Sequence, residues 1–382
     1  MPNARIFTFN TWNVGDEMQS YAVLAHLQRA QGFADRDTLA LQPPAAAPFY
    51  CVMNSWFMLG GEKPLPPAPN VLPIWHGFCA GREDLLNAEW QAYLRAQQQS
   101  IGCRDTHSVG RLQELGIPAH WTGCLTLFLG TALSDHTKPR GENVIFVDVP
   151  PEAEAHIPDF IRQRAIRLST FPPPTILHDA FKRWAYTAWL ADQLSRAALV
   201  VSRRLHVVLP AASFGTPTVA VPDPGISLAR RRFSGFESIM PTVFLEDTAQ
   251  LAKLDWRHIP PPVVPNALTQ LRFALQQQLL QRGLLPVAMP KHPLLDNLDY
   301  HTQRVYNAAK LLRPGRIRLR LAEMVQEMTI RTWSEGWVDI ALQGFPGLRK
   351  LDVMVEATVY DREDWVTWGS LHDLVMPRET FL

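Results

Sequence analysis

Short apolar runs alternate with amphipathic stretches over most of the 382-residue chain. Each run ends in a polar turn, and residues with helical spacing follow it. This alternation is typical of an α/β protein. It predicts strands at 5–9, 49–53, 71–75, 165–169, 197–201, 215–221 and 351–360, a further strand opening at residue 143, and helices at 18–30, 82–98, 152–163, 178–196, 266–282 and 301–312.

A polar segment, TALSDHTKPRGE, interrupts this pattern at 131–142. It contains Pro139 and Gly141 and has no periodicity, which is typical of a link between domains. We therefore predict two Rossmann-like domains that face a cleft, at 1–140 and 141–312. Residues 313–382 are predicted to form an appended segment, which contains Trp333, Trp337, Trp365 and Trp368. These tryptophans favour packing of a small subdomain over stacking on sugar rings.

Composition narrows the classes of function. A formal net charge of +1 gives no overall attraction to nucleic acid, so anion recognition must be local. No two of the four cysteines stand in a CxxC motif. Their wide spacing favours free thiols in a reducing compartment over a zinc site or a disulfide framework. We see no signal peptide and no apolar run long enough to span a membrane, and therefore expect a cytoplasmic protein.

The turn after the strand at 197–201 carries the strongest functional signal. Ser202, Arg203, Arg204 and His206 stand between that apolar strand and an apolar helix. Burying guanidinium and imidazole groups there costs free energy unless an anion or another polar group forms hydrogen bonds with them. Strand carboxyl ends and helix N-termini both favour anions, so the turn predicts an anion site. The alternative is an arginine pair satisfied by carboxylates, with a histidine in the core.

A second turn of the same kind lies at 100–108, where Arg104 stands at the head of a helix that Asp105 or Thr106 can cap. Its alternative role is a salt bridge to Asp105. Three consecutive arginines, Arg230 to Arg232, follow the strand at 215–221. A run of this kind is usually a solvated face, but one of the three could reach the same cleft.

The first strand also leads through a glycine turn into a helix. Asn13, Asp16 and Glu17 surround Gly15 in this turn, so they either cap the helix or line the mouth of the sheet as a substrate loop. His76 follows the strand at 71–75 and is a candidate for lining the cleft, although a core or surface histidine is the more common case.

Four stretches together resemble the polysaccharide pyruvyl transferase family. They are Asn13-x-Gly15-Asp16-Glu17, Ile101-Gly102-Cys103-Arg104-Asp105-x-x-Ser108, Gly123-Cys124-Leu125-Thr126, and Ser202-Arg203-Arg204-Leu205-His206 with Ala211 and Phe214-Gly215-x-Pro217. Their order and spacing extend over about the first 240 residues. The chain beyond about residue 312 lies outside the resemblance.

The resemblance implies a fold like that of the two-domain GT-B glycosyltransferases, with an N-terminal acceptor side and a C-terminal donor side. It implies phosphoenolpyruvate as donor, a glycan sugar, often lipid-linked, as acceptor, and a pyruvate ketal as product. In the family, residues at the positions of Arg104, Arg204, Leu205 and His206 hold the donor. A further basic residue, often Lys, has counterparts here in Arg230, Arg231 and Arg232, and we assign Arg231 to it.

The chemistry of the residues agrees with this resemblance. Phosphoenolpyruvate carries a phosphate and a carboxylate, and Arg104 and Arg204 could clamp it across the cleft. We expect His206 to act as general acid or base. Asp16 and Glu17 are candidates for the base on the sugar hydroxyl, and Asn13, Asp16 and His76 for acceptor binding. No metal site and no cofactor beyond the donor substrate are expected.

Two other functions remain open from the sequence. A GT-B glycosyltransferase could hold the diphosphate of a nucleotide-sugar at the turn of Arg204 and His206. A non-catalytic glycan-binding relative would keep the fold and bind sugar without turnover. The basic residues after 312, Arg313, Arg316, Arg318 and Arg320, form either a solvated face or a contact with lipid headgroups at the inner face of the membrane.

Overall fold

The computed structural model describes residues 4–9, 11, 13–27, 33–42, 47–57, 65–132, 141–172, 176, 180–222 and 229–284, together with four short strands in the C-terminal segment. The predicted helix at 301–312 and most of the segment at 131–142 lie outside these residues. The boundary at 140/141 and the three-part division of the chain therefore stay predictions. No helix in the described part of the chain is long and apolar enough to cross a membrane.

A four-stranded parallel sheet forms the core of the second half. Its order is β10 (Ala165–Leu168), β9 (Val144–Val147), β11 (Leu199–Ser202) and β12 (Thr218–Ala220). Helices α8 (Ala180–Arg196) and α9 (Leu205–Ser213) connect β10 to β11 and β11 to β12. Because β9 is first in the chain but lies between β10 and β11, the strand order reverses beside it. Such a reversal opens a crevice at the carboxyl ends of the strands, where ligands commonly bind.

The first half is also built from parallel strands. One sheet has the order β4 (Ser55–Phe57), β6 (Phe78–Ala80), β7 (Ile101–Cys103) and β8 (Ala119–Trp121). Two parallel pairs complete it, β1 (Ile6–Thr8) with β2 (Phe33–Asp35) and β3 (Phe49–Val52) with β5 (Val71–Ile74). The α/β class with parallel sheets is confirmed, whereas the GT-B arrangement around a cleft stays a prediction.

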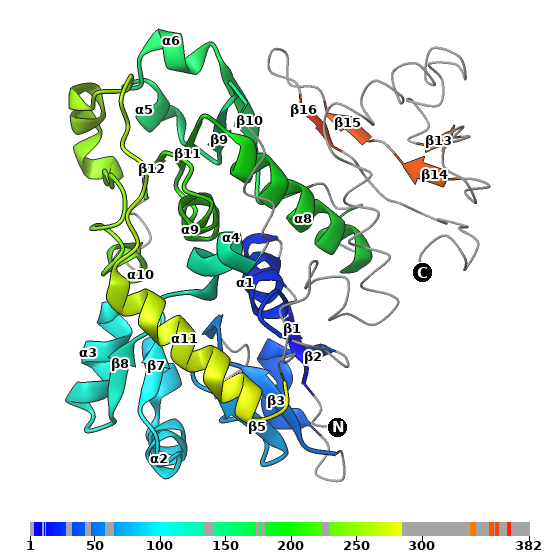
Figure 1. Ribbon diagram of the computed structural model, residues 1–382, viewed down its shortest axis with the longest axis vertical. Coiled ribbons are helices and arrows are strands. Elements are labelled where there is room, and N and C mark those ends of the chain that lie inside the picture. The colour runs from blue at the N-terminus through cyan, green and yellow to red at the C-terminus, as the bar shows by residue number, and fades with distance from the viewer. Residues whose placement is uncertain are drawn as a thin grey trace.

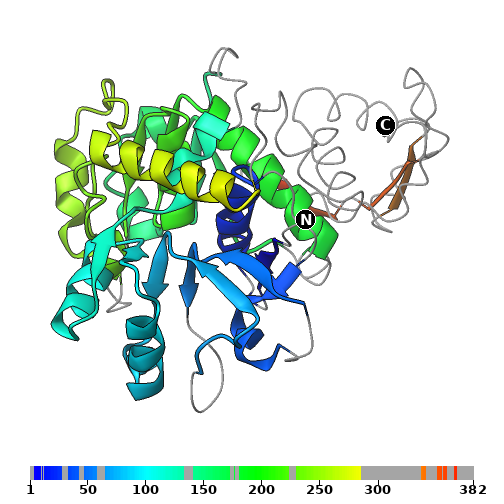
Figure 2. The same cartoon turned by 60° about the horizontal axis from the view of Figure 1, so that its bottom comes forward.

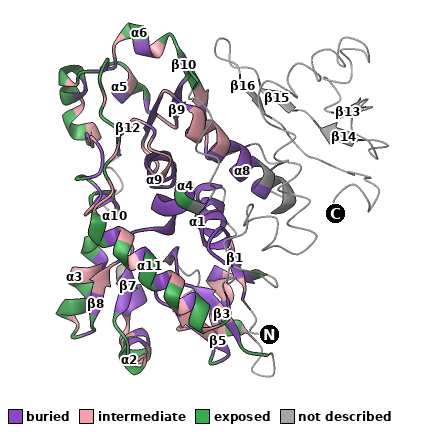
Figure 3. Ribbon diagram, viewed as in Figure 1, coloured by how far each residue is buried: buried purple, intermediate pink, exposed green. Residues whose placement is uncertain are grey.

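Helix α1 (Gly15–Leu24) joins the two halves. Every residue of α1 is buried, and its apolar side chains share one cluster with those of α8 and α9. Figure 1 shows α1 between the first-half strands and helices α8 and α9, and Figure 3 shows α1 and α9 buried along their lengths. The turn that begins α1 is therefore held by packing from both halves.

Helix α11 (Asn266–Gln281) returns from the second half to the first (Figures 1 and 2). Its Leu268 side chain reaches to within 3.4 Å of the position that a Cβ atom would take at Gly123. After the helix, the guanidinium carbon of Arg282 lies 5.8 Å from the ring centre of Tyr50 in β3. The last described helix of the main body thus packs against the first-half strands.

Two predicted helices are wrong in extent. The segment 82–98 is a 3-10 helix at Glu83–Leu86 followed by α2 (Ala88–Ala96), because the Asn87 side chain caps α2 by accepting from the backbone N–H groups of Glu89 and Trp90. The segment 152–163 is α5 (Pro151–Glu154) and α6 (Asp159–Arg162), separated by Pro158, which precedes α6. Proline restricts its own backbone and that of the residue before it.

The other predicted helices and strands that fall on described residues agree with the structure in their main part. Helix α3 (Thr106–Glu114) follows β7 as expected, and Asp105 caps it by accepting from the backbone N–H of Ser108. The predicted strand at 351–360 is described as β14 (Leu351–Met354) and β15 (Glu356–Thr358). These pair antiparallel with β13 (Trp337–Ile340) and β16 (Trp365–Thr367), respectively.

The close approach of the chain at Gly102 gives a test of this packing. A Cβ atom at Gly102 would lie 2.4 Å from the backbone oxygen of Trp75 and 2.6 Å from Cγ2 of Thr122. Gly102→Ala should therefore lower the free energy of unfolding by about 1–3 kcal/mol, as overpacking does. Gly110→Ala in α3 is the matched control, since nothing lies within 4 Å of that Cβ position. It should raise stability by about 0.5–1 kcal/mol. Urea denaturation measures both, and equal stability of the two variants would contradict the packing.

Candidate functional site

The turn between β11 and α9 is fixed by a serine. Ser202 Oγ donates to the carbonyl oxygen of Val147 in the neighbouring β9, at 2.7 Å, and accepts from the backbone N–H of Arg204, at 3.0 Å. Leu205 is buried in the core, so it can take part in a site only through its backbone. His206 departs from helical geometry in the first turn of α9, with φ −81° and ψ 22°. This geometry places Arg204 at the crevice beside β9.

Arg204 is held there by an aspartate from β9. Its Nε donates to Oδ2 of Asp148 at 2.9 Å, and its guanidinium carbon lies 4.6 Å from the ring centre of Phe171. Asp148 follows the last residue of β9 and has a φ of 51°, a conformation that Asp tolerates better than most residues. Its carboxylate also accepts from the hydroxyl groups of Ser169 and Thr170, at 2.6 and 2.7 Å. The arginine is thus oriented by a carboxylate that is itself fixed.

Burial alone would raise the pKa of Asp148, but the Arg204 guanidinium and the hydroxyl groups of Ser169 and Thr170 hold it below its ordinary value. The carboxylate is therefore ionised at neutral pH, and Arg204 keeps a charged partner.

Arg104 lies at the carboxyl end of β7 and is fully buried. One Nη group donates to Sγ of Cys79 at 2.8 Å, and Nε lies 3.4 Å from Oδ2 of Asp105. Neither Nε nor Nη1 has a hydrogen-bond partner among the residues that the structure describes. The expected ion pair with Asp105 is present, yet much of the guanidinium is left without a partner.

Arg232 and His206 meet Arg104 in the interior. Arg232 stands in the short helix α10 (Ala229–Phe233), and its guanidinium carbon lies 4.2 Å from the ring centre of Trp56. The Nε2 atom of His206 and Nε of Arg232 are buried, and no described residue offers either of them a hydrogen bond. Arg104, Arg204, His206 and Arg232 are called the cationic cluster below.

Residues of the cationic cluster shift one another's pKa values. Burial, together with the Arg104 and Arg232 guanidinium groups, lowers the pKa of His206 well below its ordinary value. Burial and Arg104 also lower the pKa of Arg232 to about 10. The imidazole is therefore neutral at neutral pH, while the guanidinium groups stay charged. An anion placed among them would offset the guanidinium contribution and raise both pKa values.

The structure separates the three consecutive arginines. Arg230 pairs with Glu246 and lies over the ring of Phe244, away from His206. Arg232 is the member whose charge acts on His206. Arg231, which the sequence analysis assigned to donor binding, lines a cavity that Arg232 also lines.

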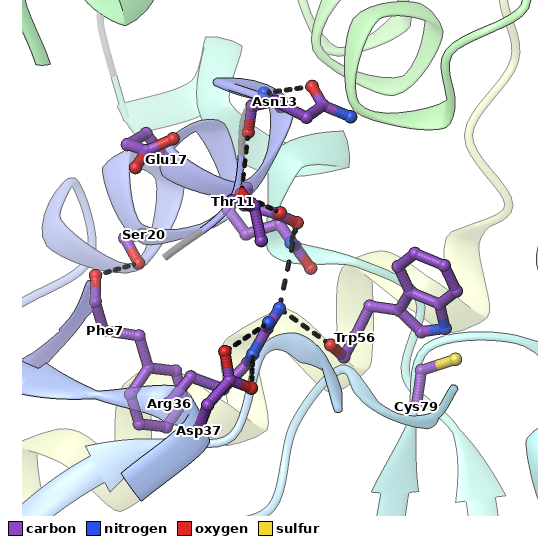
Figure 4. Close-up of polar contacts among 12 residues, drawn as sticks. Phe7, Thr11, Asn13, Glu17, Ser20, Arg36, Asp37, Trp56 and Cys79 are labelled. Atoms are coloured by element: carbon purple, nitrogen blue, oxygen red, sulfur yellow. Dashed lines mark hydrogen bonds and ion pairs between the residues drawn. The ribbon is translucent and has the colours of Figure 1, made fainter. Parts of the chain in front are cut away.

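The turn before α1 lies against the cationic cluster. A Cβ atom at Gly15 would lie 3.5 Å from Cβ of His206, and Asn13 Oδ1 accepts from the backbone N–H of Gly15 at 2.8 Å. The Asp16 carboxylate accepts from Thr11 Oγ1 at 2.8 Å and from Gln19 Nε2 at 3.1 Å, and it faces Arg36 at 4.0 Å. Figure 4 shows this network beside Trp56 and Cys79. Asn13 closes the turn, and Asp16 contributes negative charge that acts on Arg104 and Arg232.

Glu17 belongs to another contact. Its carboxylate accepts from Nε of Arg183 in α8 at 2.6 Å, and the same guanidinium also donates to the carbonyl oxygen of Thr11. Burial raises the pKa of Glu17 to about 8, with Arg183 acting in the opposite direction. The structure therefore places Glu17 in the packing of α1 against α8 and does not bring it to the cationic cluster.

His76 is also outside the cationic cluster. Burial, followed by the influence of His26 and His120, lowers its pKa to about 3, so the ring is neutral. Its surroundings are those of a core histidine, which was the alternative interpretation. The assignment of His76 to acceptor binding stays a prediction.

A cavity of about 310 Å³ adjoins the cationic cluster. It shares Arg232 with the cluster and reaches the Cys79 and Asp105 side chains that contact Arg104. Trp56 and Cys79 both line it, and they are register partners in the parallel pair of β4 and β6. Among the described residues, no group of three or more His, Cys, Asp or Glu side chains is placed to hold a metal ion.

Sequence reasoning missed Trp56, Cys79 and Asp148, and it did not separate Arg232 from its neighbours. Asp148 could have been noticed as an acidic residue directly after the buried strand at 144–147. The sequence around Trp56 and Cys79 gives no comparable signal, because their roles depend on the pairing of two strands.

Asp148→Asn tests the anchor of Arg204. The folded-state pKa of Asp148 lies below its unfolded value, so its stabilisation is present above about pH 4 and is lost as the pH falls through the folded-state pKa. The variant should lose about 1–3 kcal/mol of unfolding free energy at pH 7, and this difference should shrink in acid. Asp159→Asn, which removes an exposed partner of Arg162, is the control and should change stability by less than about 1 kcal/mol. A loss in Asp148→Asn that persists unchanged in acid would contradict the role of the charge.

Comparison with known proteins finds a match to one protein family. A model of the family described as polysaccharide pyruvyl transferase matches residues 81–223, a segment that contains Arg104, Arg204 and His206. A search of curated proteins finds no match. A solved structure described as a functional uncharacterized protein, KP1_0663 from Klebsiella pneumoniae subsp. pneumoniae NTUH-K2044, is 11% identical and matches over 60% of this chain and 87% of its own. Its TM-score of 0.35 is too low to carry an argument. The resemblance seen in the motifs is thus confirmed over residues 81–223, which match the model of the polysaccharide pyruvyl transferase family.

Proposed function

We propose that this protein transfers a pyruvyl group from phosphoenolpyruvate to two hydroxyl groups of a glycan sugar and forms a pyruvate ketal. One observation carries the proposal: Arg104, His206 and Arg232 meet in the interior with buried nitrogen atoms for which no described residue is a hydrogen-bond partner. The proposed acceptor is a glycan that is either free or lipid-linked. The proposed location is the cytoplasm, where a lipid-linked acceptor would be reached at the inner face of the membrane.

The energetics of the cationic cluster favour a small ligand with several negative charges. A buried polar group without a hydrogen bond costs about 1–3 kcal/mol, and more when it is charged. Like charges in a low dielectric also repel one another. Phosphoenolpyruvate carries a phosphate and a carboxylate, which match guanidinium groups in shape and charge. We assign Arg104, Arg204 and Arg232 to these two groups, with the backbone of Leu205 beside them. Arg231 lines the adjoining cavity, which Arg232 also lines.

The reaction balances without a further reactant. The methylene carbon of phosphoenolpyruvate gains a proton and becomes a methyl group, while one sugar hydroxyl oxygen forms a bond to the central carbon. The bond from that carbon to the phosphate oxygen then breaks, and the second hydroxyl oxygen takes its place. Of the two hydroxyl protons, one is accounted for by the new methyl group and the other by the released phosphate.

His206 is suited to move the proton to the methylene carbon. It is neutral in the free protein because burial and two guanidinium groups lower its pKa. A bound anion offsets the guanidinium charges, so the imidazole can take up a proton and deliver it. Asp16, which faces the same cluster, is our candidate for the base on the sugar hydroxyl, with Asn13 beside it. Glu17 and His76 would act on this site only through packing.

Thermal unfolding with phosphoenolpyruvate tests the proposal. A ligand at 100 times its Kd adds about 2.7 kcal/mol to the unfolding free energy, so a clear rise in Tm is expected. Arg204→Gln should weaken binding about ten- to a hundredfold, the loss expected for a charged hydrogen bond. Arg230→Gln removes the same charge from an exposed ion pair with Glu246 and should leave binding unchanged.

Two outcomes would contradict the proposal. Stabilisation by UDP- or GDP-sugars without any effect of phosphoenolpyruvate would indicate a glycosyltransferase. Stabilisation by glycans alone, with no release of phosphate from phosphoenolpyruvate, would indicate a glycan-binding protein.

A further inference from the structure

The contact between Arg104 and Cys79 fixes one end of a guanidinium group whose other nitrogen atoms are unused. One Nη group donates to Sγ of Cys79 at 2.8 Å, while the buried Nε and Nη1 atoms have no hydrogen-bond partner among the described residues. Asp105 Oδ2 forms an ion pair with Nε at 3.4 Å, and the other oxygen of that carboxylate caps α3. Cys79 is therefore the hydrogen-bonded anchor of this side chain within the described part of the chain.

The strands fix the backbone on either side of this contact. The backbone N–H of Arg104 donates to the carbonyl oxygen of Phe78 at 2.8 Å, and the carbonyl oxygen of Arg104 accepts from Nε1 of Trp121 at 3.0 Å. Successive side chains of a strand point to opposite faces, so Cys79 lies on the face of β6 away from the core residue Phe78. Because the backbone is held, the contact with Cys79 sets the direction of the Arg104 guanidinium.

The sulfur atom holds Arg104 without cancelling its charge. Burial raises the pKa of the Cys79 thiol to about 12, with Arg104 acting in the opposite direction, so the thiol is protonated at neutral pH. A neutral sulfur is a weak acceptor, whereas a carboxylate in its place would form a charge-assisted pair with the guanidinium. The charge of Arg104 accordingly still acts on His206 and Arg232.

Cys79 also stands between Arg104 and open space. Cys79 lines the cavity of about 310 Å³ beside the cationic cluster, and Arg104 does not. If the sulfur atom were removed, the guanidinium would be free to turn toward that cavity and away from His206. The thiol thus keeps the charge of Arg104 among the other members of the cationic cluster.

We propose that Cys79 is a positioning residue of the donor site, whose neutral sulfur directs the Arg104 guanidinium and leaves Nε and Nη1 to the anionic groups of the donor. That this donor is phosphoenolpyruvate rests on the proposed pyruvyl transfer. Cys79 acts through Arg104 and takes no part in the transfer itself.

Cys79→Ala tests this role, because it removes the sulfur atom and leaves Arg104 in place. Phosphoenolpyruvate should bind about three- to tenfold more weakly, the worth of a typical hydrogen bond. Cys79→Ser keeps a neutral acceptor and should restore the affinity to within about twofold of the wild type. Cys51→Ala is the matched control, since Cys51 is equally buried but donates to the carbonyl oxygen of Arg5, and its affinity should be unchanged.

The pKa of His206, followed by NMR without ligand, shows whether the effect passes through Arg104. The Arg104 guanidinium lowers this pKa, so the pKa should rise in Cys79→Ala and keep its wild-type value in Cys79→Ser and Cys51→Ala. Arg104→Gln should raise it as well. Adding Cys79→Ala to Arg104→Gln should cause no further change, because the two residues act as one unit.

The proposal would be overturned if Cys79→Ala left the affinity or the His206 pKa unchanged, or if Cys79→Ser did not restore them. An equal change of the pKa in the Arg104→Gln background would also overturn it, since Cys79 would then act by another route. Failure of the proposed pyruvyl transfer is a separate result: phosphoenolpyruvate would not bind the wild-type protein, while the His206 pKa would still respond to Cys79→Ala.

Discussion

Electrostatic repulsion among buried cations is the constraint on which this site depends. Arg104, His206 and Arg232 are brought together with few compensating contacts, and burial, reinforced by the two guanidinium groups, keeps the pKa of the imidazole low and the ring neutral. Such an arrangement costs stability in the free protein, and it is retained where a function needs it. Of the carboxylates nearby, Asp16 partly offsets the positive charge on Arg104 and Arg232, and Asp148 fixes the position of Arg204.

The scaffold holds this arrangement in place. Parallel pairing of β11 with β9 sets Ser202 opposite Val147, so Arg204, two residues after β11, lies near Asp148, the residue after β9. Helix α1 is buried against α8 and α9, so the turn at Gly15 is pressed against His206. The pair of Glu17 with Arg183 ties α1 to α8 from the opposite side. Residues far apart in sequence therefore meet because rigid elements carry them.

Part of the site could be predicted from residues that are neighbours in the sequence. The turn at 202–206 and the cap at Asp105 follow from neighbouring residues, and both are found. Asp16 and Glu17 look alike in sequence, but adjacent residues on a helix point in directions about 100° apart, so only packing decides which faces the site. Asp148 and Cys79 depend on strand order and register, and the choice of Arg232 depends on the orientation of one short helix. No local pattern contains that information.

Titration of His206 by NMR, with and without phosphoenolpyruvate, tests the central claim most directly. Ring signals assigned with His206→Gln should show, in the free protein, an imidazole that takes up its proton only well below the ordinary pKa of a histidine, because burial and the Arg104 and Arg232 guanidinium groups lower its pKa. Saturating phosphoenolpyruvate should raise that pKa, because its negative charges offset the two guanidinium groups. An ordinary pKa in the free protein, or the same pKa with and without the ligand, would contradict the account.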